Sequence, residues 1–346
     1  MKEIIDIQRM IVPESFILLE KRYDILRNIS NLQPIGRRAL SNKLNIGERI
    51  VRGEVEFFKK QGFIEIDSAG MTITSEGEKV IEGLKDFIYS IRGIHELERE
   101  LRDCLHIKEV IVVPGNLDNE NYVLADIAKA TSELMNKLIK NKDIIGITGG
   151  TTMAAVAEGM EQQNKDKNIT VVPARGGLGR RLESQSNIVA AKLAEKLKGN
   201  YQMLHASDTL SQEILQSILE DPEIKKIIEL IKKVNLLIFG IGRAEDMANR
   251  RELPQDVVEG LMKDGAVAEA FGFYFNLAGE VTYEMKTIGI QFADFIKIPN
   301  VIGVAGGARK AQAIYAISKL KKDMILVTDE GATREILKLY KNNKNY

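Results

Sequence analysis

The chain has 346 residues, of which 44% are hydrophobic and 28% charged, and this balance is typical of a globular protein of two or three domains. Basic and acidic residues number 49 each, which excludes an overall basic surface. Any nucleic-acid-binding site therefore has to come from a local concentration of basic residues. The single cysteine, Cys104, excludes an intramolecular disulfide and a cysteine-based zinc site. No apolar stretch approaches the roughly 20 residues of a membrane span. The N-terminus has no signal-peptide core, so we expect a cytoplasmic protein outside the membrane.

The first 85 residues show a pattern of three helices followed by a hairpin. Apolar spacing predicts an amphipathic helix over residues 16–29, a short helix over 35–44 and a third helix over 48–61. Two short alternating runs, residues 63–67 and 71–74, follow with a turn between them. This order is that of a winged helix-turn-helix domain, to which we assign residues 1–85.

The third helix of this domain has the composition of a DNA-recognition helix. In this architecture the third helix enters the major groove, where arginine bonds guanine edges and basic residues neutralise phosphates. Between residues 32 and 60, seven Lys or Arg residues outnumber three acidic residues. A charged helical module that contacts another protein is the alternative, but the hairpin and the local charge favour DNA. The predicted DNA-binding residues are Arg37, Arg38, Glu48, Arg49 and Arg52.

Residues 75–107 are highly charged, and their apolar residues are spaced alternately by three and four. This spacing predicts one long helix, of which residues 86–107 would link the two domains. The helix would pair with its twin in a dimer or pack on its own C-terminal domain, and the sequence does not distinguish these arrangements. We interpret His95 and His106, which lie on this charged segment, as surface residues.

From residue 108 onward, short apolar runs alternate with helical segments. Predicted strands cover residues 109–113, 144–147, 169–173, 201–204, 235–239, 302–305 and 324–327. Predicted helices cover residues 123–140, 188–198, 221–233 and 308–320. This alternation predicts an α/β fold with a Rossmann-like, largely parallel sheet that carries helices on both faces. Ligands bind such sheets at the carboxyl ends of the strands. We assign residues 108–340 to an effector-binding and oligomerisation domain.

The clearest candidate for an anion site follows the strand at residues 144–147. Gly149 and Gly150 allow the backbone to approach an anion, and Thr151 and Thr152 supply hydroxyl groups at the start of a helix. The first N–H groups of that helix and the positive end of its dipole complete a phosphate cradle. An ordinary strand-to-helix turn with a threonine cap is the alternative.

Other strand ends carry further basic and glycine-rich groups. Arg175 is followed by residues 176–178, which are Gly176, Gly177 and Leu178, while Arg250 and Lys310 follow later strands. Glu269 stands alone among small apolar residues, where a buried carboxylate needs a partner. Each group has an ordinary interpretation, such as a surface ion pair, and Glu269 could pair with Arg250 or Lys310. Together they indicate two anion sites with hydroxyl recognition between them, which suits a small bisphosphorylated sugar.

The sequence does not support other classes of site. Residues 240–245 follow a strand but lack the third glycine of a dinucleotide-binding motif, and no Gly-Lys-Ser/Thr phosphate loop occurs. His205 follows a strand without a nucleophile or metal partner beside it, so we interpret it as structural. We therefore predict no catalytic residues, no metal and no cofactor.

Four segments together resemble the SorC family of sugar-responsive bacterial transcription regulators. They are the Ile-Thr-Gly-Gly-Thr-Thr run at 147–152, Pro-Ala-Arg-Gly-Gly at 173–177, Gly-Ala-Val-Ala-Glu-Ala-Phe-Gly at 265–272 and Ile-Gly-Val-Ala-Gly-Gly at 302–307. The resemblance covers roughly residues 10–340. Many family members have Gly-Asp where this chain has Ala268 and Glu269.

The resemblance implies a sensor domain with the fold of glucosamine-6-phosphate deaminase and ribose-5-phosphate isomerase, without their chemistry. It implies fructose-1,6-bisphosphate as effector, with one phosphate held by residues 149–152. Arg175 with the turn at 176–177, Arg250 and Lys310 would complete the anion contacts, and Glu269 would bind a sugar hydroxyl.

We therefore expect a repressor of glycolytic genes that binds double-stranded operator DNA as a homo-oligomer, either a dimer or a tetramer. A phosphorylated sugar would release it from the DNA. One alternative is a sugar-phosphate isomerase or deaminase with an appended regulatory domain. Another is a scaffold that does not bind DNA, but this alternative would leave the basic third helix without a role.

Overall fold

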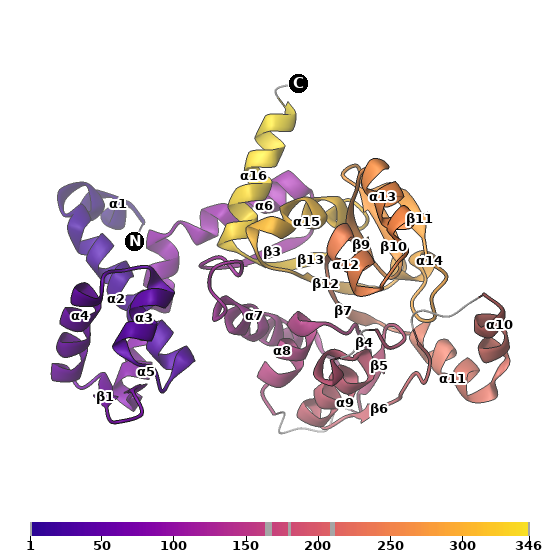
Figure 1. Ribbon diagram of the computed structural model, residues 1–346, viewed down its shortest axis with the longest axis horizontal. Coiled ribbons are helices and arrows are strands. Elements are labelled where there is room, and N and C mark those ends of the chain that lie inside the picture. Colours follow the sequence, from indigo (N-terminus) through magenta and orange to yellow (C-terminus); the bar gives the residue numbers. More distant parts are fainter. Residues whose placement is uncertain (1, 163–167, 179–180, 208–211, 345–346) are drawn as a thin grey trace. The chain divides into compact units, whose positions relative to one another are not determined.

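The computed structural model describes residues 2–162, 168–178, 181–207 and 212–344 (Figure 1). The chain divides into two compact units, Met1–His95 and Glu96–Tyr346, each with its own hydrophobic core. In the described ranges, no helix has both the length and the apolar character needed to cross a membrane.

The first unit has the predicted winged-helix order, preceded by a helix that the sequence analysis did not predict. Ile25, Val55 and Phe58 are buried in its core together with Ile64 of the hairpin. The hairpin strands pair antiparallel, with Ile64 opposite Ile73. Its elements are α1 (Lys2–Ile11), α2 (Pro13–Leu32), α3 (Arg37–Leu44), α4 (Glu48–Lys60), β1 (Ile64–Ile66), β2 (Met71–Ile73) and α5 (Ser75–Ile91).

A buried carboxylate fixes α4 against α2. Glu54 accepts from Lys21 at 2.6 Å and from Arg22 at 2.8 Å. The Arg22 guanidinium also lies 3.8 Å from the centroid of the Phe57 ring, a cation–π contact. These contacts fix the position of α4 within the domain, and α4 carries three of the predicted DNA-binding residues.

The prediction of one continuous helix over residues 75–107 is wrong. The helix α5 ends at Ile91, and α6 (Ile94–Leu105) begins after a break at Gly93, whose φ of 66° interrupts the helical backbone. Arg92, at the break, pairs with Asp24 of α2 at 2.7 Å. The apolar face of α5 also packs on α2, which the spacing alone did not reveal. Residues 86–107 therefore do not form a single linker helix.

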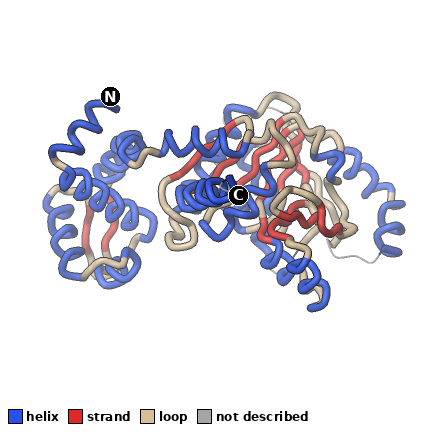
Figure 2. The backbone as a smooth tube through the Cα atoms, turned by 90° about the horizontal axis from the view of Figure 1, so that it is seen from above, coloured by secondary structure: helices blue, strands red, loops and turns tan. Residues whose placement is uncertain are grey.

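The second unit contains the predicted parallel sheet. Its strand order is β3-β13-β12-β7-β4-β5-β6, and all of these pairings are parallel. The strands are β3 (Glu109–Val113), β4 (Ile144–Ile147), β5 (Thr170–Pro173), β6 (Asn200–Tyr201), β7 (Leu236–Gly240), β12 (Asn300–Val304) and β13 (Ile325–Asp329). The strand predicted at 201–204 is shorter and begins one residue earlier. Figure 2 shows the strands of this unit flanked by helices.

Helices cover the sheet, as predicted. In Figure 1, α7, α8 and α9 lie on one face of the sheet, with α15 and α16 toward the other. Ile127, Val156 and Leu193 bury their side chains against Ile145 and Ile238 of the sheet. These helices and the remaining ones are α7 (Val123–Leu138), α8 (Thr151–Gly159), α9 (Ser186–Leu197), α10 (Gln212–Glu220), α11 (Pro222–Ile231), α15 (Ala311–Ser318) and α16 (Glu330–Lys344).

A second, antiparallel sheet lies between β7 and β12 in the sequence, and the sequence analysis missed it. Its order is β11-β10-β9-β8, with Glu269 opposite Tyr274. Phe271 and Gly272 form the β9–β10 turn with φ angles of 56° and 85°, and phenylalanine is an unusual residue in that position. This segment contains β8 (Gly242–Arg243), α12 (Ala244–Arg250), α13 (Gln255–Lys263), β9 (Ala266–Ala270), β10 (Phe273–Asn276), β11 (Val281–Glu284) and α14 (Phe292–Phe295).

Asp329, at the carboxyl end of β13, ties together the loops that follow β3 and β12. Its buried carboxylate accepts from the N–H groups of Leu117 at 2.8 Å, Gly307 at 2.7 Å and Ala332 at 2.8 Å. Gly307 has a φ of 98°, and an added Cβ would meet Asp118 at 2.4 Å. This arrangement fixes the turn that leads directly to Lys310.

We expect Asp329→Ala to lower the free energy of unfolding by about 3 kcal/mol, because three backbone N–H groups would lose a buried acceptor. Urea unfolding followed by circular dichroism measures this change. Glu335→Ala is the matched control, since its carboxylate forms only an exposed pair with Lys338. Equal unfolding midpoints for the two variants would show that Asp329 does not hold these loops together.

Candidate functional site

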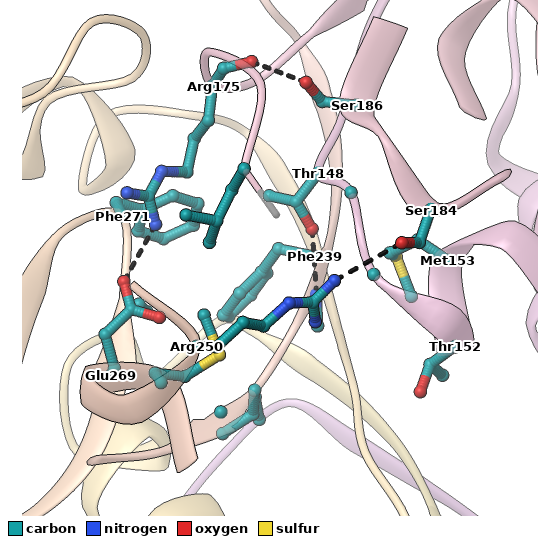
Figure 3. Close-up of a pocket in the computed structure, with 18 of the residues that line it drawn as sticks. Thr148, Thr152, Met153, Arg175, Ser184, Ser186, Phe239, Arg250, Glu269 and Phe271 are labelled. Carbon is teal, nitrogen blue, oxygen red and sulfur yellow. Dashed lines mark hydrogen bonds and ion pairs between the residues drawn. The ribbon is translucent and has the colours of Figure 1, made fainter. Parts of the chain in front are cut away.

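A pocket opens at the carboxyl ends of β4, β5 and β7, where the loops of the parallel sheet meet the antiparallel sheet (Figure 3). Every residue predicted to bind the effector lines this pocket, except Gly177. These residues are Gly149, Gly150, Thr151, Thr152, Arg175, Gly176, Leu178, Arg250, Glu269 and Lys310. Gly177 instead donates its N–H to the carbonyl of Ala206 at 2.9 Å, and this bond orients the loop.

The glycine turn after β4 brings the start of α8 to the pocket. Gly150 is the N-cap residue of α8 with a φ of 113°, and no side chain caps the helix. The alternative of a threonine N-cap is therefore wrong. The N–H of Gly150 donates to the carbonyl of Ser184 at 2.8 Å. A Cβ atom added to Gly149 would lie 2.6 Å from the oxygen of that carbonyl. Glycine thus permits a close backbone approach that leaves the first turn of α8 facing the pocket.

Arg175 reaches the pocket from the loop that follows β5. Its backbone pairs with Gly289, and its carbonyl accepts from the hydroxyl of Ser186 at 2.8 Å. Its side chain is nearly buried, and Nη1 donates to Oε1 of Glu269 at 2.8 Å. The guanidinium is therefore held at the pocket wall by an ion pair in a region with little solvent.

Glu269 lies at the centre of a buried charge cluster. Its Oε1 atom accepts from Arg175, from Nη2 of Arg251 at 2.9 Å and from the N–H of Gly272 at 2.7 Å. Burial alone would raise the pKa of Glu269, but the charges of Arg251 and Arg175 and the Gly272 hydrogen bond outweigh it and lower the pKa to about 2. The carboxylate is therefore ionised throughout the physiological range.

The alternative that Glu269 pairs with Arg250 or Lys310 is wrong, because its partners are Arg175 and Arg251. Sequence reasoning did not include Arg251 in the site. The available signal was the pair of adjacent arginines at the end of a helix, since consecutive helical side chains point in different directions. One of the two can therefore line a pocket while its neighbour pairs elsewhere.

Two further cations line the pocket. Nη2 of Arg250 donates to the hydroxyl of Ser184 at 3.3 Å, and Nζ of Lys310 donates to the carbonyl of Ile241 at 3.0 Å. Burial lowers the pKa of Lys310, while the carboxylates of Asp246, Asp118 and Asp329 act in the opposite direction. Figure 3 shows Arg175 turned toward Glu269 and Arg250 turned toward Ser184.

These groups favour a small ligand with several negative charges. Arg175, Arg250 and Lys310 supply positive charge from three separate segments of the chain, and the start of α8 supplies backbone donors. Glu269 adds one acceptor, and Phe239 and Phe271 form an apolar part of the wall. Such a combination can bind phosphate groups and a hydroxyl group of the same molecule.

The predicted DNA-binding residues lie in the first unit and are exposed. Arg37 and Arg38 begin α3, while Glu48, Arg49 and Arg52 lie in the first turns of α4. Arg37 makes a long contact of 3.9 Å with Glu56. The opposite side of α4 is buried in the domain core, so the exposed side is accessible to a partner.

Two protein families match the chain, one in each part. Residues 18–88 match the CggR N-terminal DNA binding domain, and residues 89–338 match a sugar-binding domain. The chain is 40% identical over 338 residues to the Central glycolytic genes regulator of Bacillus subtilis (strain 168), covering 98% of this chain and 99% of that protein. It is 42% identical over 339 residues to the protein of the same name from Priestia megaterium, with the same shares covered.

Solved structures agree with these sequence matches. A SorC family transcriptional regulator from Enterococcus faecalis is 39% identical, with a TM-score of 0.67 over 70% of this chain and 100% of that chain. The full-length sorbitol operon regulator SorC from Klebsiella pneumoniae has a TM-score of 0.67 over 92% of this chain and 98% of its own. Its identity is 18%, so this likeness concerns the fold alone.

We expect the stabilising effect of Glu269 to disappear in acid. The pKa of Glu269 in the folded chain is below the usual value of 4.5. The ionised carboxylate therefore stabilises the fold at pH values above its pKa in the unfolded chain, and this stabilisation is lost as the pH falls toward about 2. Glu269→Gln should lower the free energy of unfolding at pH 7 by about 3 kcal/mol, because two guanidinium groups would lose their counter-charge. The difference from the unmodified chain should shrink steadily between pH 5 and about pH 3.

Urea unfolding at a series of pH values measures this dependence, with Glu335→Gln as an exposed control. A destabilisation by Glu269→Gln that stays constant from pH 7 to pH 3 would contradict a lowered pKa for Glu269.

Proposed function

We propose that this chain, which belongs to the SorC family of transcription regulators, represses glycolytic genes until a phosphorylated sugar releases it from its operator. It has a CggR-type DNA-binding domain and a sugar-binding domain. The proposed effector is fructose-1,6-bisphosphate. The name shared by the two relatives that align along nearly the whole chain supports a role in central glycolysis.

The observation that carries the proposal is the convergence of cations and backbone donors on one pocket. One phosphate would bind at the start of α8, where the turn at Gly149 and Gly150 and the hydroxyl of Thr152 supply donors. Arg175, Arg250 and Lys310 would complete the contacts to the phosphates, and Glu269 would accept from a sugar hydroxyl. A bisphosphorylated sugar carries both kinds of group in a single small molecule.

For DNA, we propose that α4 enters the major groove and that Arg49 and Arg52 contact base edges or phosphates. Arg37 and Arg38 would contact the backbone from α3. A homo-oligomer would present two such domains to the two half-sites of an operator. The sugar can release the DNA only by binding more tightly to the arrangement of subunits that binds the operator poorly.

The alternative of a sugar-phosphate isomerase or deaminase has less support. The two serine hydroxyl groups that line the pocket hold its loops: Ser186 donates to the carbonyl of Arg175 at 2.8 Å, and Ser184 donates to that of Arg181 at 3.2 Å. The full-length relatives at 40% and 42% identity are named as regulators. Turnover of a phosphosugar by the full chain would reverse this preference.

We expect fructose-1,6-bisphosphate to weaken operator binding at least about tenfold, which needs only ~1.4 kcal/mol of coupling. The measurement is fluorescence anisotropy with the DNA upstream of the chain's own gene, at one fixed salt concentration, because phosphate contacts depend steeply on salt. Tight binding that does not respond to this sugar would contradict the proposed effector. The absence of specific DNA binding would contradict the repressor itself.

Two substitutions should separate the two sites. Thr152→Val keeps the shape of this buried side chain but removes its hydroxyl, so we expect at least about tenfold weaker binding of the sugar with unchanged operator affinity. Arg49→Ala, on α4, should weaken operator binding by about 1–3 kcal/mol and leave sugar binding unchanged. The same two assays, applied to both variants, serve as controls for each other. A sugar-binding defect in Arg49→Ala, or normal sugar binding by Thr152→Val, would contradict the assignment.

A further inference from the structure

Arg251 belongs to the charge cluster of the pocket although it does not line the pocket. It directly follows Arg250 at the end of α12, but its side chain is fully buried. Nη2 of Arg251 donates to Oε1 of Glu269 at 2.9 Å, and Nη1 donates to the hydroxyl of Tyr274 at 3.1 Å. Arg250 instead donates to Ser184 in the pocket wall. The two neighbouring arginines therefore have separate surroundings.

The cluster holds two guanidinium groups against one carboxylate. Arg175 and Arg251 donate to the same oxygen of Glu269, so the sum of the three charges is one positive charge. All three side chains are at most 10% exposed, so water screens these charges weakly. Without Arg251, Glu269 would balance Arg175 one to one, and this cluster would add no net positive charge to that provided by Arg250 and Lys310.

The geometry also determines which oxygen of Glu269 is engaged. Arg175, Arg251 and the N–H of Gly272 all donate to Oε1, and no described residue donates a hydrogen bond to Oε2. Arg251, which does not line the pocket, therefore fixes the carboxylate through one oxygen. The second oxygen keeps its capacity to accept a hydrogen bond.

We propose that Arg251 is a positioning residue of the effector site. It holds Glu269 through Oε1 and offsets the charge of this carboxylate, so that the positive charge of Arg175 is available to a phosphate group. Arg251 itself does not touch the ligand. This inference rests on the proposed function of the pocket as a sugar-phosphate site, and it adds a residue that acts from behind the pocket wall.

The test compares the full chain with Arg251→Met, Arg251→Lys, Glu269→Gln and the double variant Arg251→Met/Glu269→Gln. Isothermal titration calorimetry with fructose-1,6-bisphosphate and, separately, with inorganic phosphate measures the affinities. Arg251→Met should weaken both ligands about tenfold, because it makes the cluster neutral. Arg251→Lys, which keeps the charge, should lose less.

The double variant provides the discriminating measurement, because it restores one net positive charge without restoring Arg251. Its affinity for inorganic phosphate should recover by about threefold or more relative to Arg251→Met. Recovery with fructose-1,6-bisphosphate should be smaller, since the double variant also lacks the carboxylate that would accept from a sugar hydroxyl. A role of Arg251 in packing alone predicts no recovery with either ligand.

Arg309→Met is the matched control, since Arg309 lies on the turn beside Lys310 but its side chain is 68% exposed. We expect this variant to change both affinities less than about twofold, because solvent screens the charge. Urea unfolding followed by circular dichroism, measured for every variant, checks that the second unit, which has its own core, still folds.

Each outcome decides the inference. Normal phosphate affinity in Arg251→Met, or a double variant no better than Arg251→Met, overturns it. If the unmodified chain binds inorganic phosphate but not fructose-1,6-bisphosphate, the proposed effector is wrong, and the phosphate series alone decides the role of Arg251. If the unmodified chain binds neither anion, the proposed function and this inference are both overturned.

Discussion

The ion pairs of Glu269 join the two sheets of the second unit, and the shape of the pocket depends on them. The carboxylate comes from β9 in the antiparallel sheet, Arg175 from the loop after β5, and Arg251 from the end of α12. A buried carboxylate is costly without partners, so these elements must meet at one point for the fold to be stable. The same requirement places Arg250, the neighbour of Arg251, in the wall of the pocket.

Each positively charged side chain of the pocket is held in place by a different partner. Glu269 holds Arg175, a carbonyl holds Lys310, and Ser184 holds Arg250. Asp329 fixes the turn before Lys310 through backbone N–H groups. Charges that are fixed in advance need little reorganisation when an anion binds, and the apolar wall beside them strengthens the attraction.

The two units have separate cores, so the proposed response of α4 to a ligand in the pocket has to pass from one unit to the other. The break at Gly93 limits how far a single rigid helix can carry such a signal, because α5 is packed on α2 inside the first unit. The proposed release of DNA by a sugar phosphate therefore requires two arrangements of the molecule with different affinities for that ligand, rather than one continuous rigid helix.

The order of the winged helix, the parallel sheet and the pocket residues from Gly149 to Lys310 could be predicted from the sequence. These features depend on local periodicity, on turns and on the rule that the carboxyl ends of parallel strands meet at one edge. The antiparallel sheet, the helix break at Gly93 and the partners of Glu269 became visible only in the folded chain. The β9–β10 hairpin uses an atypical Phe271–Gly272 turn, and Arg251 meets Glu269 from 18 residues away in the sequence. Such contacts follow from the packing of distant segments, which leaves no periodic signal in the sequence.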